Sequence, residues 1–142
     1  MTPEFYKTPS VKNHLCTSSV ISRNGKILLG LRHYHDASLW VAPGGRCDAG
    51  ESPEAAVLRE IQEEIGVTDA RIVRQLGEYP GVYADEAGRD RVIVFEVATE
   101  QEPTLMEPEK FEKWQWFSLE EIPANLINPE VALGCFQKAL KK

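Results

Sequence analysis

The feature that most constrains this chain is a helix whose start and stop are both marked in the sequence. Ser52 is a favourable N-cap residue, Pro53 suits the first helical position, and Gly66 suits the end of the helix. Apolar residues spaced three and four apart between these signals predict one face that packs on a core. These apolar positions are Leu58, Ile61 and Ile65.

The same helix carries three glutamates with helical spacing. Glu60, Glu63 and Glu64 are spaced i, i+3 and i+4, so we expect all three on one face, away from the apolar residues. Like charges at this spacing repel by roughly a few tenths of a kcal/mol per pair. A divalent cation would reverse that repulsion, because Mg²⁺ accepts carboxylate oxygens together with water and phosphate. A short acidic run is nevertheless more often a solvated helix face.

The surroundings of the glutamates favour a site over a solvated face. The glycines of residues 43–45 predict a tight turn before the helix. Glu51 lies just before the helix, and Arg59 directly precedes Glu60. Such a gathering of charged residues around a glycine turn is hard to explain by solubility alone.

The rest of the pattern predicts strands before and after this helix. Asn24 and Gly25 separate two strand-like runs, 20–21 and 27–29, which is the strongest short hairpin signal. We also expect loops at 33–39 and 77–90, strands at 40–41, 70–76, 91–97 and 113–117, and a helical turn at 119–122 capped by Ser118. A second helix is predicted over 129–140, with apolar positions Val131, Leu133, Phe136 and Leu140. This order of elements indicates an α/β fold with a mixed sheet packed between helices.

Length and charge narrow the class of protein further. A chain of 142 residues with 42% hydrophobic residues can bury one core, so we expect an irregular arm at 1–11 and a single domain at 12–142. A net charge of -6 disfavours a broad cationic surface for nucleic acid or for an anionic membrane. A phosphate-bearing partner would therefore have to bind at a localised site and not on a broad charged surface.

The number and spacing of the cysteines indicate the cellular compartment. The cysteines, Cys16, Cys47 and Cys135, are an odd number and widely spaced, which favours neither a disulfide framework nor a zinc knuckle. The sequence has no apolar run of 18 residues and no signal-peptide pattern at its start. We therefore expect a cytoplasmic protein that does not interact with membranes.

The segment from Gly45 to Val67 resembles a complete Nudix box. Its defining residues are Gly45, Glu51, Arg59, Glu60, Glu63, Glu64 and Gly66, with Ile61 and Val67 at the apolar positions. The wider similarity covers about residues 12–140. The resemblance implies a Nudix-type α/β/α sandwich and hydrolysis of a nucleoside diphosphate linked to another group, with Mg²⁺ or Mn²⁺ as cofactor.

The resemblance also implies roles for individual residues. Glu60 and Glu64 would bind the metal, Glu63 would ligate it or polarise a bound water, and the Gly45 carbonyl would be a further ligand. Arg59 would orient neighbouring carboxylates, and Glu51 would support the junction of loop and helix. The general base stays open between a box glutamate and Glu109 or Glu112, with Glu112 kept as a catalytic residue.

Residues 107–117 resemble a second segment, found in MutT-like nucleoside triphosphate diphosphatases. This similarity implies hydrolysis of a nucleoside or deoxynucleoside triphosphate to monophosphate and diphosphate. Sugar nucleotides, dinucleoside polyphosphates and prenyl diphosphates are alternative substrates, and a silent nucleotide-sensing domain is an alternative of another class. Bulk nucleic acid is not expected as a partner, and a homodimer stays open.

Several side chains are predicted to contact the substrate. Arg32 and Arg46 flank the expected metal site, and arginine binds phosphate bidentately. Trp114 would stack on a base, although packing in the core is the common role of such a ring. Trp40 and Tyr83 complete the predicted substrate-binding set.

Overall fold

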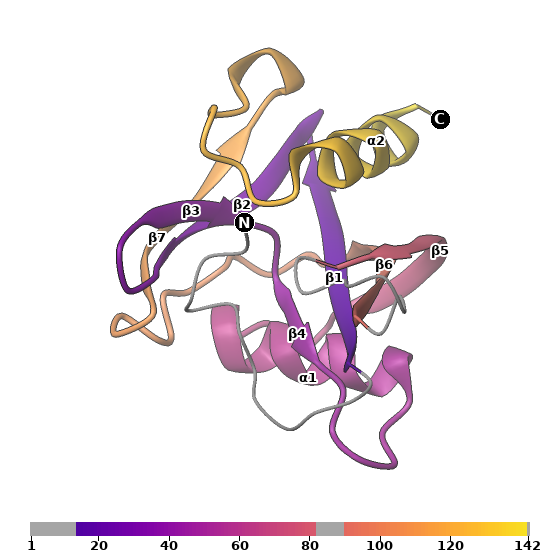
Figure 1. The fold of residues 1–142 in the computed structure, drawn as a ribbon. Helices are drawn as coiled ribbons and strands as arrows, with labels where there is room; N and C mark the ends of the chain where they lie inside the picture. The colour runs from indigo at the N-terminus through magenta and orange to yellow at the C-terminus, as the bar shows by residue number, and fades with distance from the viewer. Residues whose placement is uncertain (1–13, 82–89, 142) are drawn as a thin grey trace.

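The computed structural model describes residues 14–81 and 90–141, and there a mixed sheet lies between two α-helices (Figure 1). The elements in chain order are β1 His14–Arg23, β2 Lys26–His33, β3 Ser38–Val41, β4 Gly44–Arg46, α1 Pro53–Ile65, β5 Arg71–Pro80, β6 Asp90–Ala98, β7 Phe111–Phe117, the 3₁₀ helix η2 Leu119–Glu121, and α2 Pro129–Leu140. The expected fold class is confirmed.

Strand β1 is the centre of the sheet. It runs parallel to β6, with Cys16 beside Val92 and Ser18 beside Val94, and antiparallel to β2 and β4. Strand β5 pairs antiparallel with β6, and β3 and β7 both pair antiparallel with β2. Because one of these pairings is parallel and the others are antiparallel, the sheet is mixed.

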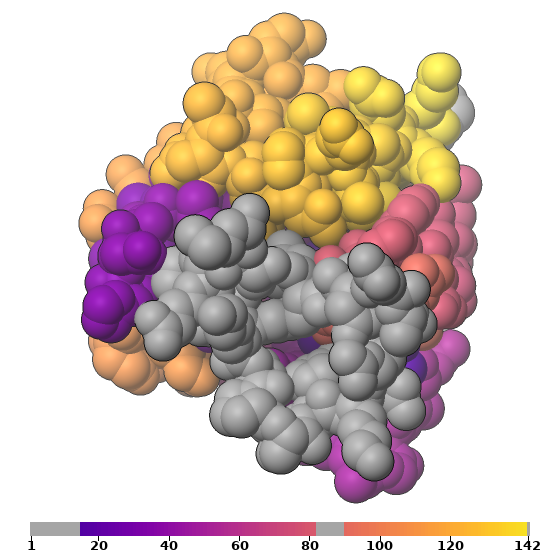
Figure 2. Space-filling model, in the orientation of Figure 1, coloured from indigo at the N-terminus to yellow at the C-terminus, as the bar shows by residue number. Residues whose placement is uncertain are grey.

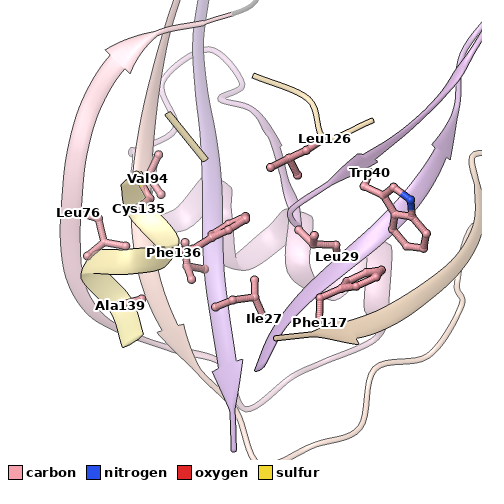
Figure 3. Packing of buried hydrophobic residues seen from close by; sticks show 11 residues of the cluster. Ile27, Leu29, Trp40, Leu76, Val94, Phe117, Leu126, Cys135, Phe136 and Ala139 are labelled. Carbon is pink, nitrogen blue, oxygen red and sulfur yellow. The ribbon is translucent and has the colours of Figure 1, made fainter. Parts of the chain in front are cut away.

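Alternate residues of β1 face opposite sides of the sheet, so they enter two separate cores. Val20 packs in the core beneath α2, whereas Ile21 packs in the core beneath α1. Figure 3 shows the first of these cores, where Phe136 and Ala139 of α2 lie against the sheet with Leu76 and Val94 nearby. The two helices therefore bury opposite faces of one sheet, as a sandwich requires.

The core under α2 continues to the strands at the other end of the sheet. The ring of Trp40 packs edge-on against Phe117, with ring centroids 4.8 Å apart, and Leu126 lies beside them (Figure 3). At the opposite end α2 lies beside β5, and the C-terminal segment and β5 share the face seen in Figure 2.

The signals at the ends of the helices are confirmed. Ser52 accepts a hydrogen bond from the Ala55 N–H at 3.1 Å, and Gly66 ends α1 in the left-handed conformation with a φ of 71°. The hairpin also has the predicted turn, because Asn24 and Gly25 both have positive φ. Helix α2 has the predicted bounds, and η2 follows Ser118 as expected.

The apolar faces of both helices differ in part from the expectation. The buried stripe of α1 consists of Val57, Ile61 and Ile65, with Leu58 only half-buried at its edge. Glu64 lies two turns after Val57, so it falls on the buried side and not on an exposed acidic face. In α2, Leu133 is exposed, and the buried positions belong to Cys135, Phe136 and Ala139.

Two expected loops are shorter than predicted, and one expected turn is a strand. Residues 77–80 extend β5, and residues 33 and 38–39 belong to β2 and β3. The glycines of residues 43–45 were expected to form a turn, yet Gly44–Arg46 is strand β4, paired with β1. Neither Gly44 nor Gly45 has a positive φ, so cross-strand pairing and not turn geometry determines their conformation.

The predicted arm at residues 1–11 and the predicted contact residue Tyr83 lie outside the described residues. Within the ranges that the structure describes, neither helix is long and apolar enough to cross a membrane.

Candidate active site

Arg59 is the centre of a network that joins α1 to the segment before it. Its guanidinium donates two parallel hydrogen bonds to Glu51, at 2.8 and 3.0 Å. It also donates to Glu60 at 2.9 Å, to Glu63 at 3.2 Å and to the carbonyl of Arg46 at 2.9 Å. A bidentate pair of this kind fixes both orientation and charge. Arg59 thus connects the helix, its preceding loop and strand β4.

The network also shifts the acidity of its members. Hydrogen bonds from Arg59 and from the Asp48 N–H lower the pKa of Glu51 to about 2. Pairing with Glu51 raises the pKa of Arg59 in turn. Both groups are therefore charged at neutral pH, and Glu51 holds the loop to the helix because it also accepts from Asp48 at 2.9 Å.

Glu64 is the most deeply buried carboxylate of the helix. It is 4% exposed, and it accepts a hydrogen bond from the Gly44 N–H at 3.0 Å. Burial raises its pKa to about 8, because desolvation disfavours the charged form more than the Gly44 N–H favours it. A carboxyl held in this way is neutral in much of the population at pH 7 and becomes a strong ligand once a cation compensates its charge.

Glu60 lies directly against the backbone of β4. A Cβ atom placed on Gly45 would lie 2.4 Å from the carboxyl carbon of Glu60, so the Glu60 carboxylate would have to move away. The carbonyl of Gly45 accepts a hydrogen bond from the Thr17 hydroxyl at 3.1 Å. Burial raises the pKa of Glu60, and Arg59 opposes that shift. Gly45 therefore leaves the space that the Glu60 carboxylate occupies beside the chain.

These residues fit the metal ion that the resemblance implies. Within residues 14–81 and 90–141, no three His, Cys, Asp or Glu side chains are arranged so that they could hold a metal ion, and Arg59 donates hydrogen bonds to the carboxylates of Glu60 and Glu63. The donor set itself consists of carboxylate and carbonyl oxygens, the hard ligands that Mg²⁺ and Mn²⁺ prefer. A cation bound here would favour the ionised form of Glu64, which burial disfavours.

Sequence reasoning missed Glu107 and favoured its neighbours. Glu107 lies close enough to Glu64 to help raise its pKa, and Lys110 lies close enough to Glu60 to oppose the rise there. Glu107 and Lys110 also pair with each other at 3.4 Å. Glu109 and Glu112 are exposed and do not line the cleft described below. Glu107 and Lys110 lie three residues apart around Pro108, and this spacing in a turn is the signal that could have singled out the pair.

A cleft begins at this carboxylate cluster and runs across the sheet towards α2. Glu64, Gly44 and Gly45 form one end, and Arg32 with Tyr34 lies at its margin. Its walls are mainly apolar and come from β1, β6 and the start of α2. Wall residues are Val20, Val41, Val92, Val94, Leu126, Ile127, Val131 and Phe136. A charged end that continues into an apolar pocket suits a ligand with a phosphate part and a less polar part.

The structure brings only some of the predicted contact residues to this cleft. Arg32 lines it, and its guanidinium lies 5.2 Å from the ring centroid of Tyr34. Arg46 lies on β4 opposite Cys16, a residue that lines the cleft. Trp40 is buried in the core, with 8% exposed.

Trp114 lies on the side of the sheet that faces α1, away from the cleft. Its ring packs against Phe111, with centroids 4.7 Å apart, and covers Gly30, where a Cβ would lie 2.7 Å from the ring. Trp116, two residues later on β7, packs against the same core as Trp114. The structure therefore places Trp114 against the core and not in the cleft.

The geometry agrees with three comparisons. The family description NUDIX domain matches residues 12–133. A curated RNA pyrophosphohydrolase of Acidiphilium cryptum is 35% identical over 126 residues, which cover 75% of this chain and 76% of that protein. An 8-oxo-dGTP diphosphatase of Proteus vulgaris is 34% identical over 58 residues, 39% of this chain and 52% of that protein.

A solved structure is similar over most of the chain. The MutT NUDIX hydrolase from Burkholderia pseudomallei shares 29% identity and a TM-score of 0.69, covering 87% of this chain and 97% of that one. The box residues, the mixed sandwich fold and the family match therefore agree, and this chain belongs to the Nudix family of hydrolases, which act on phosphoanhydride bonds.

Proposed function

We propose that this hydrolase converts a nucleoside or deoxynucleoside triphosphate to the monophosphate and diphosphate, with Mg²⁺ or Mn²⁺ as its cofactor. The observation that carries the proposal is the cleft that joins the carboxylate cluster to an apolar pocket. Its charged end suits the phosphates with their cation, and its apolar end suits the nucleoside.

The metal would be held by Glu60 and Glu64, with Glu63 and the Gly45 carbonyl as further ligands. A bound divalent cation makes a water more acidic and neutralises charge on the phosphates. Glu107 is added to this proposal because it lies close to Glu64. Glu112 is withdrawn as a catalytic residue because it is exposed and away from the cleft.

The remaining roles belong to side chains around the cluster. Arg59 keeps Glu51, Glu60 and Glu63 in a fixed arrangement through its hydrogen bonds. Glu63, whose side chain is 51% exposed, can reach solvent and accept a proton from an attacking water. Arg32, at the margin of the cleft, would contact a phosphate. We propose the apolar walls of the cleft as the contacts of the nucleoside, in place of the predicted Trp40 and Trp114.

A second substrate is favoured by the names of the relatives that match most of the chain. Those relatives are RNA pyrophosphohydrolases, and a triphosphate at the 5′ end of an RNA carries the same anhydride bonds. An RNA end would enter the cleft through its first nucleotide, so the net charge of -6 disfavours only extended contacts beyond it. Bulk nucleic acid is not proposed as a partner.

The experiment is a substrate panel with Mg²⁺, with released diphosphate and phosphate measured separately. It contains nucleoside and deoxynucleoside triphosphates, 5′-triphosphorylated RNA, sugar nucleotides, dinucleoside polyphosphates and prenyl diphosphates. We expect diphosphate release from free triphosphates. Turnover of RNA ends alone would establish the second substrate instead, and activity only on the capped or prenylated diphosphates would overturn the proposal.

Two further proposals concern where the enzyme works and in what form. Its cysteines Cys16, Cys47 and Cys135 are all free thiols, which suits the reducing cytoplasm. A homodimer stays a prediction, to be checked by light scattering of the purified protein.

A further inference from the structure

The guanidinium of Arg32 contacts two aromatic rings at the margin of the cleft. Its central carbon is 5.2 Å from the ring centroid of Tyr34 and 5.8 Å from that of Phe111. Both distances are within the range of about 6 Å over which the face of a ring attracts a cation. Phe111 is 1% exposed, whereas Arg32 and Tyr34 are half-buried and line the cleft. The guanidinium therefore has one ring in the interior and one ring at the cleft.

The interior ring is fixed by the sheet. Arg32 of β2 and Phe111 of β7 are paired in register, so their side chains leave the same face of the sheet. The ring of Phe111 also packs against Trp114, with centroids 4.7 Å apart. Beside it, the His33 N–H donates to the Lys110 carbonyl at 2.8 Å, which ties the start of β7 to the end of β2. The fold alone thus places Phe111 next to Arg32.

The ring at the cleft is fixed by a turn. Tyr34 is the first residue after β2, in the connection to β3. Its N–H donates to the Ala37 carbonyl at 2.7 Å, and the Nδ1 atom of His33 lies 3.2 Å from the Ser38 hydroxyl oxygen. Because these two interactions close the turn, the backbone of Tyr34 is held in place without help from a ligand.

Arg32 is also close to the carboxylate end of the cleft. Its charge opposes the rise in the pKa of Glu64, as a nearby cation must. An arginine side chain normally loses rotamer freedom when it binds a ligand, which weakens binding. A guanidinium already stacked on rings has lost part of this freedom in advance, and its planar fork then presents its donors in a fixed direction. Preorganisation of this kind increases affinity without a new contact to the ligand.

We propose that Tyr34 is a positioning residue whose ring holds the guanidinium of Arg32 in the orientation that contacts a phosphate. The inference rests on the proposed function in one respect, the contact between Arg32 and a phosphate. Tyr34 acts through Arg32 and takes no part in bond cleavage. The role belongs to the aromatic ring, so a phenylalanine can perform it.

The test is calorimetry of inorganic diphosphate in the presence of Mg²⁺. Diphosphate has no base or sugar, so a direct contact between Tyr34 and a nucleoside cannot influence the result. We expect Tyr34→Leu to weaken binding at least about fivefold, the scale of a partly desolvated cation–π contact. Tyr34→Phe keeps the ring and should bind as tightly as the wild type. His35→Leu changes an exposed residue of the same turn and is the control, with unchanged affinity expected.

A double-mutant cycle separates positioning from a general structural effect. Arg32→Met removes the guanidinium but keeps an apolar stem, and it should weaken binding at least as much as Tyr34→Leu. In the Arg32→Met background, Tyr34→Leu should cause less than about a twofold further loss, because the group through which it acts is gone. Melting temperatures verify that all variants are folded.

Three results would overturn the inference. They are an equal loss from Tyr34→Leu in both backgrounds, a loss in Tyr34→Phe as large as in Tyr34→Leu, and a wild type that does not bind diphosphate. Failure of the proposed function would appear separately, as a substrate panel without triphosphate turnover, and would leave the comparison of diphosphate affinities valid.

Discussion

Glu51 and Arg59 are joined by two parallel hydrogen bonds, and through this pair the loop before α1 is held to the helix that carries the glutamates. The pair is mostly buried, with 16% and 29% of the two side chains exposed. Its geometry depends on the planar fork of arginine, which a lysine ammonium does not reproduce.

Arg59→Lys should therefore reduce both stability and turnover. We expect the free energy of unfolding to fall by about 1–2 kcal/mol, since charge-assisted hydrogen bonds are lost while the charge is kept. The turnover number should fall by at least about tenfold because the carboxylates of Glu60 and Glu63 lose their common donor. Urea unfolding and steady-state kinetics measure the two effects. Arg71→Lys, at an exposed position of β5, is the control and should change neither.

Gly45→Ala should disable the site without unfolding the protein. The new methyl group would collide with the Glu60 carboxylate and displace it. We expect a loss of Mn²⁺ affinity, measured by electron paramagnetic resonance, and a fall in turnover of about a hundredfold. Gly134→Ala is the control, because nothing lies within 4 Å of its Cβ and the residue is in α2. It should keep full activity and gain about 0.5–1 kcal/mol of stability. Normal Mn²⁺ binding by Gly45→Ala would contradict the proposed ligand set.

Glu63→Gln should lower the turnover number by at least about a hundredfold, the scale expected when a metal-activated water is misplaced. The side chain is half-exposed, so the melting temperature should hardly change. Glu54→Gln replaces an exposed glutamate in the first turn of the same helix and should turn over normally. Near-normal turnover by Glu63→Gln would remove this residue from the reaction.

The metal-free protein should lose stability as the pH rises from about 4.5 to about 8. The pKa of Glu64 is 4.5 in a model peptide and is raised to about 8 in the folded protein. The unfolded chain therefore releases a proton in this range that the folded protein retains, which favours unfolding. Below pH 4.5 both states are protonated, and the penalty disappears.

Melting temperatures in a chelating buffer at several pH values measure this effect. Glu64→Gln should flatten the part of the slope between pH 4.5 and 8, whereas Glu54→Gln should keep it. Mg²⁺ should raise the melting temperature of the wild type, since a ligand that binds only the folded state stabilises it. An identical slope in Glu64→Gln would show that another group causes the dependence.

Local signals predicted the elements of this fold well. Ser52, Gly66 and the Asn24-Gly25 turn each act through neighbouring backbone, so the sequence alone locates them. Strand β4 could not be predicted in this way, since Gly44 is strand-like only because it pairs with Ser18, far away in the chain. The same limit applies to Glu64, whose burial depends on the sheet beneath α1.

The site was predicted less completely than the fold. The box residues of α1 are neighbours in sequence, so helical spacing brings them together. Tyr34 and Glu107 come from segments that only the tertiary structure places beside the cleft or the glutamates. Trp114 shows the opposite error, because an aromatic alternation in a strand does not reveal which face of the sheet it covers.

The alternation of β1 has a consequence for how this enzyme could change. The hydroxyls of Thr17 and Ser19 hold the carbonyls of Gly45 and Pro43, so the odd positions anchor the glycine strand. The even positions Cys16, Ser18 and Val20 line the cleft without holding these carbonyls, and Thr17 borders the cleft as well. Substitutions at the even positions can therefore alter the choice of substrate while the hydroxyls that anchor the glycine strand stay in place.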